Sequence, residues 1–451
     1  MTLLPLLFVL AASPQLSVLK TDLPVWDVAA ADLDGNGKAD ILALCSDPEN
    51  LPLRKQLAVF LAEEGGYPSA PSFTLPLATE TGGVFLAEID GTAPAELAVT
   101  GPAGAQIHSY ADRSLKAGET VKFTSLLPSH VEQPVFLKNT AADFNGDGKD
   151  EWLVPVATGF EIHSLGGLVA RVEADMNNSV ESGETNRITH RIPSYTPFQL
   201  PGQPLKGLAF MSDKYVDYAY GDNWSEHSRF KIPLDLKEKW VAEARMSDID
   251  GNGLPDLVVT QTQGTVNIKG LTQVYFAKEP FTFSETPDVT FPVNGALSNP
   301  LVKDVNGDGK SDLLFIKVPF GVKMIMNYLM SQRLSLTIEA HLLKDGNFAV
   351  EPDMKSGLTV DAPENRKRVA YALGDFNGDK WIDLAFGSGA AELVFYTGTP
   401  ERLLSSKPWQ KLAVPSIGEA RPYKLNEGDA EDLVIFHPSS PDDKRIDVIV
   451  F

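Results

Sequence analysis

Short apolar runs alternate along the whole chain with turns rich in Asp, Asn, Gly and Pro. In one recurring pattern, an apolar run is followed by an Asp/Asn/Gly loop and then by an acid that opens a second apolar run. The clearest copies are VAAADLDGNGKADILAL from Val28, TAADFNGDGKDEWLVPV from Thr140, ARMSDIDGNGLPDLVVT from Ala244, LVKDVNGDGKSDLLFI from Leu301 and YALGDFNGDKWIDLAFG from Tyr371. Apolar runs this short, bounded by turn residues, predict β-strands joined by tight hairpins.

Weaker copies of the pattern fill the gaps between the clear ones. The copy from Phe85 keeps the loop length but loses its middle polar positions, and the copies from Phe210 and Lys424 have shortened loops. The acid that opens the second apolar run is then Asp40, Glu96, Glu151, Asp217, Asp256, Asp312, Asp383 and Asp432. These positions divide the chain into eight units of roughly 50 residues, a period typical of repeat folds.

Several units also contain a second motif, in which an apolar strand is followed by a charged hairpin, an aromatic residue and Pro. Examples begin at Val59, Val274 and His341. A full unit therefore reads as four short strands. Four-stranded repeats of this period predict an all-β fold, a β-propeller whose blades pack against two neighbours in a ring. The fourth unit, about residues 207–236, is short, so the count is seven or eight four-stranded blades, and we favour eight.

The two ends of the chain suggest how the ring closes. The last unit stops after its third strand, RIDVIVF, at Phe451, and the segment Gln15–Leu23 resembles a spare fourth strand. We therefore expect the N-terminal strand to complete the last blade, and the alternative is an unpaired N-terminal tail. Closure of this kind protects the edges of the end blades.

The first residues predict export. Residues 1–13 (MTLLPLLFVLAAS) contain an apolar stretch and small residues, as a signal peptide does, although no basic residue precedes them. The apolar run is too short to cross a bilayer, which takes about 20 residues, and no later run is long enough. We expect residues 1–13 to be a signal peptide and residues 14–451 to form a single propeller domain. The alternative for the first residues is a buried strand.

Charge narrows the range of partners. The chain has 39 Lys+Arg against 60 Asp+Glu, which gives a formal net charge of -21. This balance argues against nucleic acid or an anionic membrane as the main partner and favours the binding of cations. Cys45 is the only cysteine, so neither an intrachain disulfide nor a cysteine-based zinc site can form.

The loops of the clear copies carry oxygen atoms at regular positions. In the loop from Asp32 to Asp40, positions 1, 3, 5 and 9 carry side-chain oxygens and position 7 can offer its carbonyl, while Gly at position 6 allows a positive φ. Hard oxygen ligands of this number suit Ca²⁺. Mg²⁺ prefers a stricter octahedron, and transition metals prefer His or Cys, which these loops lack.

These loops resemble the β-hairpin calcium loops of FG-GAP/VCBS repeats, the family that includes the head propeller of integrin α-subunits. The resemblance covers residues 15–451 and implies an exported, non-catalytic propeller, with its calcium loops on the face opposite the ligand face. It also implies four or five structural Ca²⁺ sites. Their ligands would be Asp32, Asp34, Asn36, the Lys38 carbonyl and Asp40; Asp143, Asn145, Asp147, the Lys149 carbonyl and Glu151; Asp248, Asp250, Asn252, the Leu254 carbonyl and Asp256; Asp304, Asn306, Asp308, the Lys310 carbonyl and Asp312; and Asp375, Asn377, Asp379, the Trp381 carbonyl and Asp383.

The alternative for these loops is that Asp, Asn and Gly only form hairpin turns. The loop from Asp375 is the doubtful member, because Lys380 replaces the glycine at position 6. A positive φ at a residue other than glycine costs roughly 1 kcal/mol. The loop from Glu88 lacks a ligand at position 5, where Thr92 stands, and the two shortened loops are expected to be metal-free turns.

No sequence motif indicates catalysis. The His residues form neither HxH nor HExxH, and the chain has no GxSxG motif and no phosphate-binding glycine loop. We expect a monomeric, non-catalytic binding or adhesion-type module for a protein or polysaccharide ligand, outside the cell or at its surface. The alternatives are a secreted polysaccharide-active enzyme (a glycosidase or lyase) and a structural subunit of an envelope assembly.

Four aromatic residues of the fourth unit are the candidate ligand contacts. They are Tyr215, Tyr218, Tyr220 and Trp224. If exposed, they would suit a glycan; if buried, they are blade core.

Overall fold

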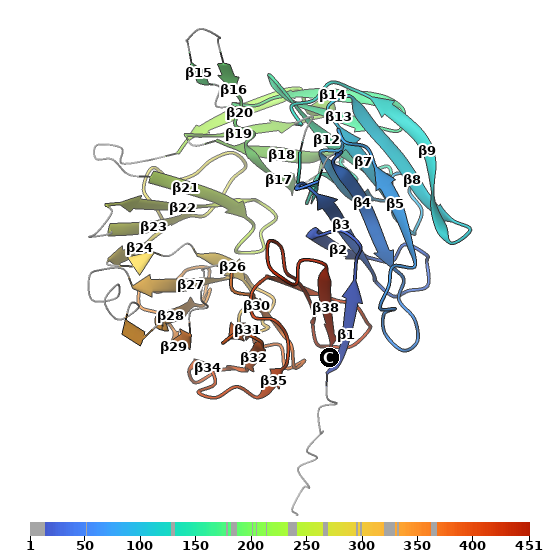
Figure 1. Ribbon diagram of the computed structural model, residues 1–451. Helices are drawn as coiled ribbons and strands as arrows, with labels where there is room; N and C mark the ends of the chain where they lie inside the picture. Colours follow the sequence, from blue (N-terminus) through green and yellow to red (C-terminus); the bar gives the residue numbers. More distant parts are fainter. Residues whose placement is uncertain are drawn as a thin grey trace, which may run out of the picture.

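A computed structural model shows a ring of eight β-sheets (Figure 1). It describes residues 14–451 except 51, 128–130, 177–178, 182–186, 201, 204, 213, 233–240, 265–268, 295, 298–299, 320–329, 332 and 362–367. The predicted signal peptide, residues 1–13, lies outside the described residues. Within the described part of the chain, we find no helix with the length and apolarity needed to cross a bilayer.

Each sheet is a blade of four consecutive antiparallel strands, except that blade 8 takes its fourth strand from the other end of the chain. Blade 1 is β2 (Val25–Ala31), β3 (Asp40–Asp47), β4 (Arg54–Phe60) and β5 (Phe73–Leu77); blade 2 is β6 (Gly83–Ala87), β7 (Glu96–Gly101), β8 (Gly104–Ala111) and β9 (Ser114–Lys122); blade 3 is β11 (Ala141–Ala142), β12 (Glu151–Val156), β13 (Gly159–Ser164) and β14 (Gly167–Glu173); blade 4 is β17 (Ser194–Gln199), β18 (Lys206–Met211), β19 (Tyr215–Tyr220) and β20 (Glu226–Lys231).

The second half of the ring follows the same order. Blade 5 is β21 (Val241–Ser247), β22 (Asp256–Gln263), β23 (Lys269–Tyr275) and β24 (Val289–Asn294); blade 6 is β26 (Leu301–Lys303), β27 (Asp312–Pro319), β28 (Arg333–His341) and β29 (Met354–Asp361); blade 7 is β30 (Tyr371–Gly374), β31 (Asp383–Ser388), β32 (Glu392–Tyr396) and β35 (Gln410–Leu412); blade 8 is β36 (Glu419–Tyr423), β37 (Asp432–Phe436), β38 (Arg445–Val450) and β1 (Gln15–Lys20).

A few short elements supplement the blades. The strand β10 (Val135–Phe136) runs parallel to β6, and β25 (Ala296–Leu297) pairs with β27. Two small hairpins are formed by β15 (Ser179–Glu181) with β16 (Arg187–Thr189) and by β33 (Gly398–Thr399) with β34 (Leu403–Leu404), and η1 (Asp222–Trp224) is a 3₁₀ turn.

The predicted eight-bladed propeller is therefore confirmed, and the fourth unit is a complete blade. Its first strand is β17, which precedes the segment 207–236 that the sequence indicated. The predicted closure is confirmed as well. β1 pairs with β38 from Gln15 opposite Val450 to Lys20 opposite Arg445, so the two ends of the chain share one blade.

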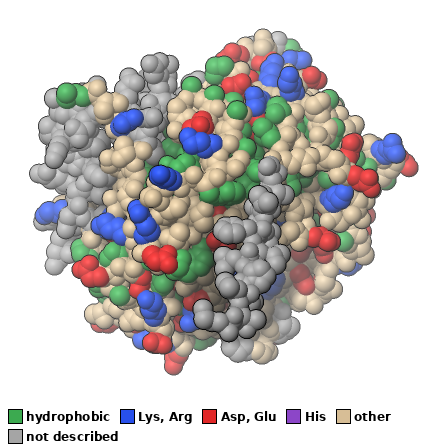
Figure 2. Space-filling model, turned by 90° about the horizontal axis from the view of Figure 1, so that it is seen from below, with side chains coloured by type: hydrophobic (Ala, Val, Ile, Leu, Met, Phe, Trp, Pro, Cys, Tyr) green, Lys and Arg blue, Asp and Glu red, His purple; other side chains and the backbone are tan. Residues whose placement is uncertain are grey.

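The core consists of eight apolar clusters, one between each pair of neighbouring blades in the described residues. Phe85 of blade 2 and Trp152 of blade 3, for example, belong to one cluster. Each sheet thus buries both faces against its neighbours, and the stability of every blade depends on the next. Charged side chains lie outside these clusters, and on the side of the ring that Figure 2 shows, acidic and basic groups are interspersed.

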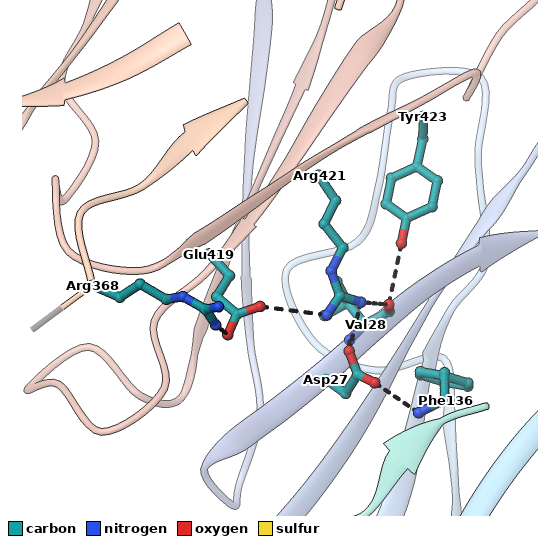
Figure 3. A network of polar contacts seen from close by, with 7 residues as sticks. All are labelled: Asp27, Val28, Phe136, Arg368, Glu419, Arg421 and Tyr423. Carbon is teal, nitrogen blue, oxygen red and sulfur yellow. Dashed lines mark hydrogen bonds and ion pairs between the residues drawn. The ribbon is translucent and has the colours of Figure 1, made fainter. Parts of the chain in front are cut away.

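Polar contacts between inner strands also join blade 8 to blade 1 (Figure 3). Arg421 of β36 pairs with Asp27 of β2 at 2.5 Å and donates to the Val28 carbonyl at 2.7 Å. Asp27 also accepts the N–H of Phe136 in β10 at 2.7 Å. Because Asp27 is almost fully buried, these partners offset its desolvation, and the network connects three blades at the point of closure.

Candidate metal sites in the blade hairpins

Each of the five predicted loops is the hairpin between the first and second strands of its blade, in blades 1, 3, 5, 6 and 7. In blade 1, the Asp32 carboxylate accepts the N–H groups of Gly35 and Gly37, each at 2.8 Å. The side chains of Asp34 and Asn36 each accept the N–H group two residues further along, at 3.2 and 2.8 Å. The loop is thereby folded around its own side-chain oxygens.

The same hydrogen bonds recur in the other four loops. The carboxylate at position 1 accepts the N–H groups of positions 4 and 6 at 2.6–3.0 Å. Position 3 accepts the N–H of position 5, and position 5 accepts that of position 7. The residues at positions 1, 3, 5 and 7 are Asp143, Asn145, Asp147 and Lys149; Asp248, Asp250, Asn252 and Leu254; Asp304, Asn306, Asp308 and Lys310; and Asp375, Asn377, Asp379 and Trp381.

The acid at position 9 is the first residue of the second strand in all five blades, and we call it the latch acid. The latch acids are Asp40, Glu151, Asp256, Asp312 and Asp383, and they are at most 1% exposed. One oxygen of each accepts the N–H of position 2 at 2.8–3.1 Å. In the four Asp cases, the other oxygen accepts an N–H just beyond the third strand at 2.6–2.8 Å. In these four blades, the latch acid therefore connects the hairpin to the end of the third strand.

Burial dominates the electrostatics of these latch acids. It raises the pKa of Asp40 and Asp312 to about 6 and the pKa of Asp256 and Asp383 to about 7, and nearby loop carboxylates contribute to each rise. Metal binding requires the ionised carboxylate. A cation in the loop would thus favour the charge state that burial disfavours.

Two of the loops bring three carboxylates together. In blade 1, oxygens of Asp32, Asp34 and Asp40 lie within 4.8 Å of one another, and in blade 5 the same holds for Asp248, Asp250 and Asp256. In blades 3, 6 and 7, position 3 is Asn, whose amide donates to the Asp at position 5 at 3.0–3.3 Å. The all-oxygen donor set and its negative charge fit a hard cation such as Ca²⁺.

The doubtful fifth loop has the same backbone as the others. Lys380 adopts φ 71°, close to the 81° of Gly37 at the same position, and its N–H donates to Asp375 at 2.7 Å. The loop is thus formed in spite of the unfavourable side chain at position 6, and positions 1, 3 and 5 accept the same backbone N–H groups in all five loops.

Neighbouring hairpins contact one another around the ring. The N–H of Glu88 in the blade 2 loop donates to Asp150 of blade 3 at 2.9 Å. The N–H of Asp375 in blade 7 donates to Glu431 of blade 8 at 2.9 Å. A change in the conformation of one of these hairpins can therefore affect the neighbouring blade through these hydrogen bonds.

Two hairpins keep the latch acid without the ligand set. In blade 2, Glu96 accepts the N–H of Ile89 at 2.9 Å. In blade 8, Asp432 accepts the N–H groups of Leu425 and Phe451, each at 2.9 Å. The latch acid is thus a feature of the hairpin itself, in seven of the eight blades. Blade 2 also keeps acids at positions 1 and 3, Glu88 and Asp90, but has Thr92 at position 5.

Blade 8 also shows a replacement that sequence reasoning missed. The prediction of a shortened loop was wrong here, because Lys424 and Asp432 are spaced as Asp32 and Asp40 are, and the Leu425 N–H donates to Asp432 as in the other loops. Lys424 occupies position 1, where the five predicted sites have Asp, and its ammonium donates to the carbonyls of Gly428 at 2.8 Å, Asp429 and Ala430 at 3.0 Å. A side-chain cation thus lies within the one loop that has a base at its first position. The available signal was the Lys at that position.

Blade 4 differs from the prediction. Asp217 does not open the second strand, because the second strand of blade 4 is β18 and Asp217 lies two residues into the third strand, β19. The connection that corresponds to the Asp loop, residues 200–205 between β17 and β18, is shorter than in the five blades with the loop, and Asp217 pairs with Arg229 on β20. The aromatic cluster is mostly blade core: Trp224 and Tyr218 are 1% and 3% exposed.

Comparison with known proteins agrees with the repeat interpretation. Residues 248–315, from the loop of blade 5 into β27 of blade 6, match the family described as FG-GAP-like repeat. None of the curated proteins compared matches the chain. Among solved structures, the V. cholerae biofilm matrix protein Bap1 aligns with a TM-score of 0.44 at 11% identity, over 96% of this chain and 88% of that chain. BBS1N, solved in complex with ARL6DN, aligns with a TM-score of 0.37 at 10% identity, over 97% and 96%.

Proposed function

The chain is an eight-bladed β-propeller that carries an FG-GAP-like repeat, and on this premise we propose that it is an exported, calcium-stabilised, non-catalytic binding module for a protein or polysaccharide ligand. The calcium ions would be held by the five hairpin loops described above. Their role would be structural, because each loop joins the first two strands of a blade, and in four of the five the latch acid also contacts the end of the third strand.

The observation that carries the calcium proposal is the contrast between the loops. Five hairpins have Asp at position 1 and Asp or Asn at positions 3 and 5, whereas the hairpin with Lys424 at its first position directs an ammonium group at its own loop carbonyls. If the loop needed no positive charge, there would be no reason for a lysine ammonium to lie in a loop that lacks the aspartate at position 1. The close carboxylates of blades 1 and 5 repel one another unless a cation lies between them.

The proposal of a binding module follows from where the perturbed carboxyl groups and the variable loops lie on the ring. The strongly perturbed carboxyl groups with a pKa of about 6 or 7 are latch acids, which the hairpins account for. The Asp loops occupy one end of every blade that has them. The turns and connections at the other end are free to vary, and a rigid scaffold with variable loops is typical of ligand binding.

A binding screen tests this function. The calcium-loaded protein is applied to an oligosaccharide microarray and, separately, to a panel of purified extracellular proteins, and bound oligosaccharides are checked for cleavage by mass spectrometry. Saturable binding without new products is the expected result. Cleavage would favour the polysaccharide-active enzyme instead, and absence of binding in both arms would contradict the proposal.

Export is tested on the same chain. The full sequence is expressed with its own N-terminus, and the exported fraction is analysed by N-terminal sequencing. We expect a mature chain that begins near Pro14. Retention in the cytoplasm with Met1 intact would contradict export and leave the binding proposal to be judged separately.

A further inference from the structure

A polar groove of about 720 Å³ lies between blades 3 and 4. Its walls are the turn of residues 157–158, the connection of residues 173–176 and the strands β19 and β20. Residues 157–158 join β12 to β13, so they lie at the end of blade 3 opposite its Asp143 loop. The groove therefore opens away from the candidate metal sites, on the end of the ring where the loops vary.

A buried acid on the third strand of blade 4 lines this groove. Asp217 faces blade 3, since its carboxylate accepts the N–H of Asp175 at 3.0 Å, and the residue is 7% exposed. Third strands of other blades carry buried and paired acids as well: Glu339 of β28 pairs with Lys317 and Lys355, and Asp447 of β38 pairs with Arg445. A buried carboxylate in a blade interface is costly unless it is paired, and the partner of Asp217 is Arg229, whose side chain also lines the groove.

Asp217 positions an arginine at the groove. The Arg229 guanidinium donates to it through Nε at 2.5 Å and Nη2 at 3.1 Å, and lies 4.8 Å from the centre of the Tyr215 ring. The hydrogen bonds to Asp217 raise the pKa of Arg229, which stays charged. Its side chain is still 55% exposed, and its remaining N–H groups have no partner among the residues that the structure describes. The arginine is thus held from one side and presents donors on the other.

The neighbouring groups add both donors and acceptors. His227 and Ser228 precede Arg229 on the same strand, and the exposed Glu173 lies on the blade 3 wall. The acids that line the groove are Glu173, Asp175 and Asp217, against the single guanidinium. This excess of acid disfavours an anionic ligand, while the mixture of donors and acceptors suits hydroxyl groups, which can both donate and accept.

We infer that this groove binds a neutral carbohydrate, with Arg229 and His227 donating to its hydroxyl groups and Glu173 accepting from them. The inference rests on the proposed binding function and names its ligand class and place. The volume lies within the range of small-ligand sites. The buried Asp217 then acts as a positioning residue that fixes the guanidinium.

The test uses the calcium-loaded full chain on a microarray of neutral and uronic-acid oligosaccharides, followed by titration calorimetry with the neutral oligosaccharide that binds best. Arg229→Gln should weaken binding by about 10- to 100-fold, the usual loss of a hydrogen bond from a charged group. Arg54→Gln is the matched control, because Arg54 is also an exposed arginine paired with an aspartate, at 3.2 Å in blade 1. It should leave the affinity unchanged.

A second variant keeps the test valid if Arg229→Gln disturbs the fold. His227 is exposed, so His227→Ala should retain the melting temperature and lower the affinity several-fold. Wild-type affinity in both variants would overturn the inference while leaving the binding function intact, as would binding to uronic-acid oligosaccharides alone. A chain that binds proteins and no oligosaccharide would also overturn it. Failure of the proposed function would appear differently, as no binding in either screen.

Discussion

The hairpins that open blades 5 and 8 share their last residue but differ in their first. Both end in a fully buried Asp, Asp256 or Asp432, which accepts one N–H from within the loop and one from the end of the third strand. At position 1, blade 5 has Asp248 and blade 8 has Lys424. Blade 5 then gathers three carboxylates within 4.8 Å, whereas blade 8 directs an ammonium group at three carbonyls.

The comparison shows that the acids of the repeated motif have two different roles, which the sequence pattern alone does not distinguish. The latch acid is needed for the hairpin in either blade, with or without a metal. The acids at positions 1 and 3 serve another purpose, because the hairpin of blade 8 forms without them. If blade 5 binds Ca²⁺, both loops contain a positive charge: the metal ion in blade 5 and the Lys424 ammonium in blade 8. The following predictions test whether the two charges play the same part.

The largest effect should come from pH, because four buried latch acids act together. Their pKa values of about 6 (Asp40, Asp312) and about 7 (Asp256, Asp383) lie above the ordinary 3.8. The folded, metal-free protein therefore holds more protons than the unfolded chain between about pH 4 and pH 7, and its stability should fall as pH rises through that window. With calcium the slope should reverse, because the bound carboxylates must be ionised.

Urea unfolding of metal-free and calcium-loaded protein at several pH values measures both slopes. Other titrating groups contribute equally to the two forms, so each form serves as the control for the other. Parallel slopes in the presence and absence of calcium would show that the latch acids do not face a metal.

Next in size are the latch acids themselves. Asp256→Ala and Asp432→Ala each leave two buried N–H groups without an acceptor, which should cost about 3 kcal/mol of unfolding free energy in metal-free protein. In calcium, Asp256→Ala should cost more than Asp432→Ala, since it also removes a ligand. Denaturant unfolding in both conditions gives the comparison, and an equal calcium dependence of the two variants would contradict it.

Position 1 offers a smaller and more selective change. Asp248→Asn should reduce the calcium content by one ion and lower stability by about 2 kcal/mol in saturating calcium, with little effect after chelation. Lys424→Met should lower stability by about 1 kcal/mol in both conditions, because its ammonium bonds do not involve a metal. A calcium-dependent effect of Lys424→Met would remove the distinction between the two loops.

The smallest effect concerns the loop of blade 7. Lys380 has φ 71°, so Lys380→Gly should relieve left-handed strain and raise the unfolding free energy by up to about 1 kcal/mol. Calcium content should stay the same, because the Lys380 side chain is not a ligand. A drop in calcium content in this variant would show that the lysine supports the site in another way.

Much of the fold could be predicted because each blade repeats its own local signals. The Asp/Asn/Gly hairpin marks the first two strands, and the unpaired strands at the two ends indicated the closure between β1 and β38. Blade 4 was harder, since it lacks the loop. Its first strand, Ser194–Gln199, was missed, and Asp217 was aligned with the latch acids although it lies two residues into β19.

For the candidate sites too, residues that are close in sequence could be predicted, whereas contacts between different strands could not. The candidate ligands from Asp32 to Asp40 lie close together in sequence, so their spacing and the resemblance to FG-GAP/VCBS loops were enough to propose them. That they bind a metal stays a prediction. The pairing of Asp217 with Arg229 depends on the register of β19 against β20, which places the two residues opposite each other. Likewise, the second partner of Asp256 is the N–H of Ala277, beyond the third strand. Contacts of this kind follow from packing and register, which the local pattern does not contain.

The central claim is that the Asp loops hold structural calcium, and the most direct test measures metal content and melting temperature of residues 14–451 before and after chelation. The account predicts four or five Ca²⁺ per chain and a fall in Tm of more than about 10 °C on chelation, restored by added calcium. A chain without bound calcium, whose Tm is the same in calcium and in chelator, would contradict the claim.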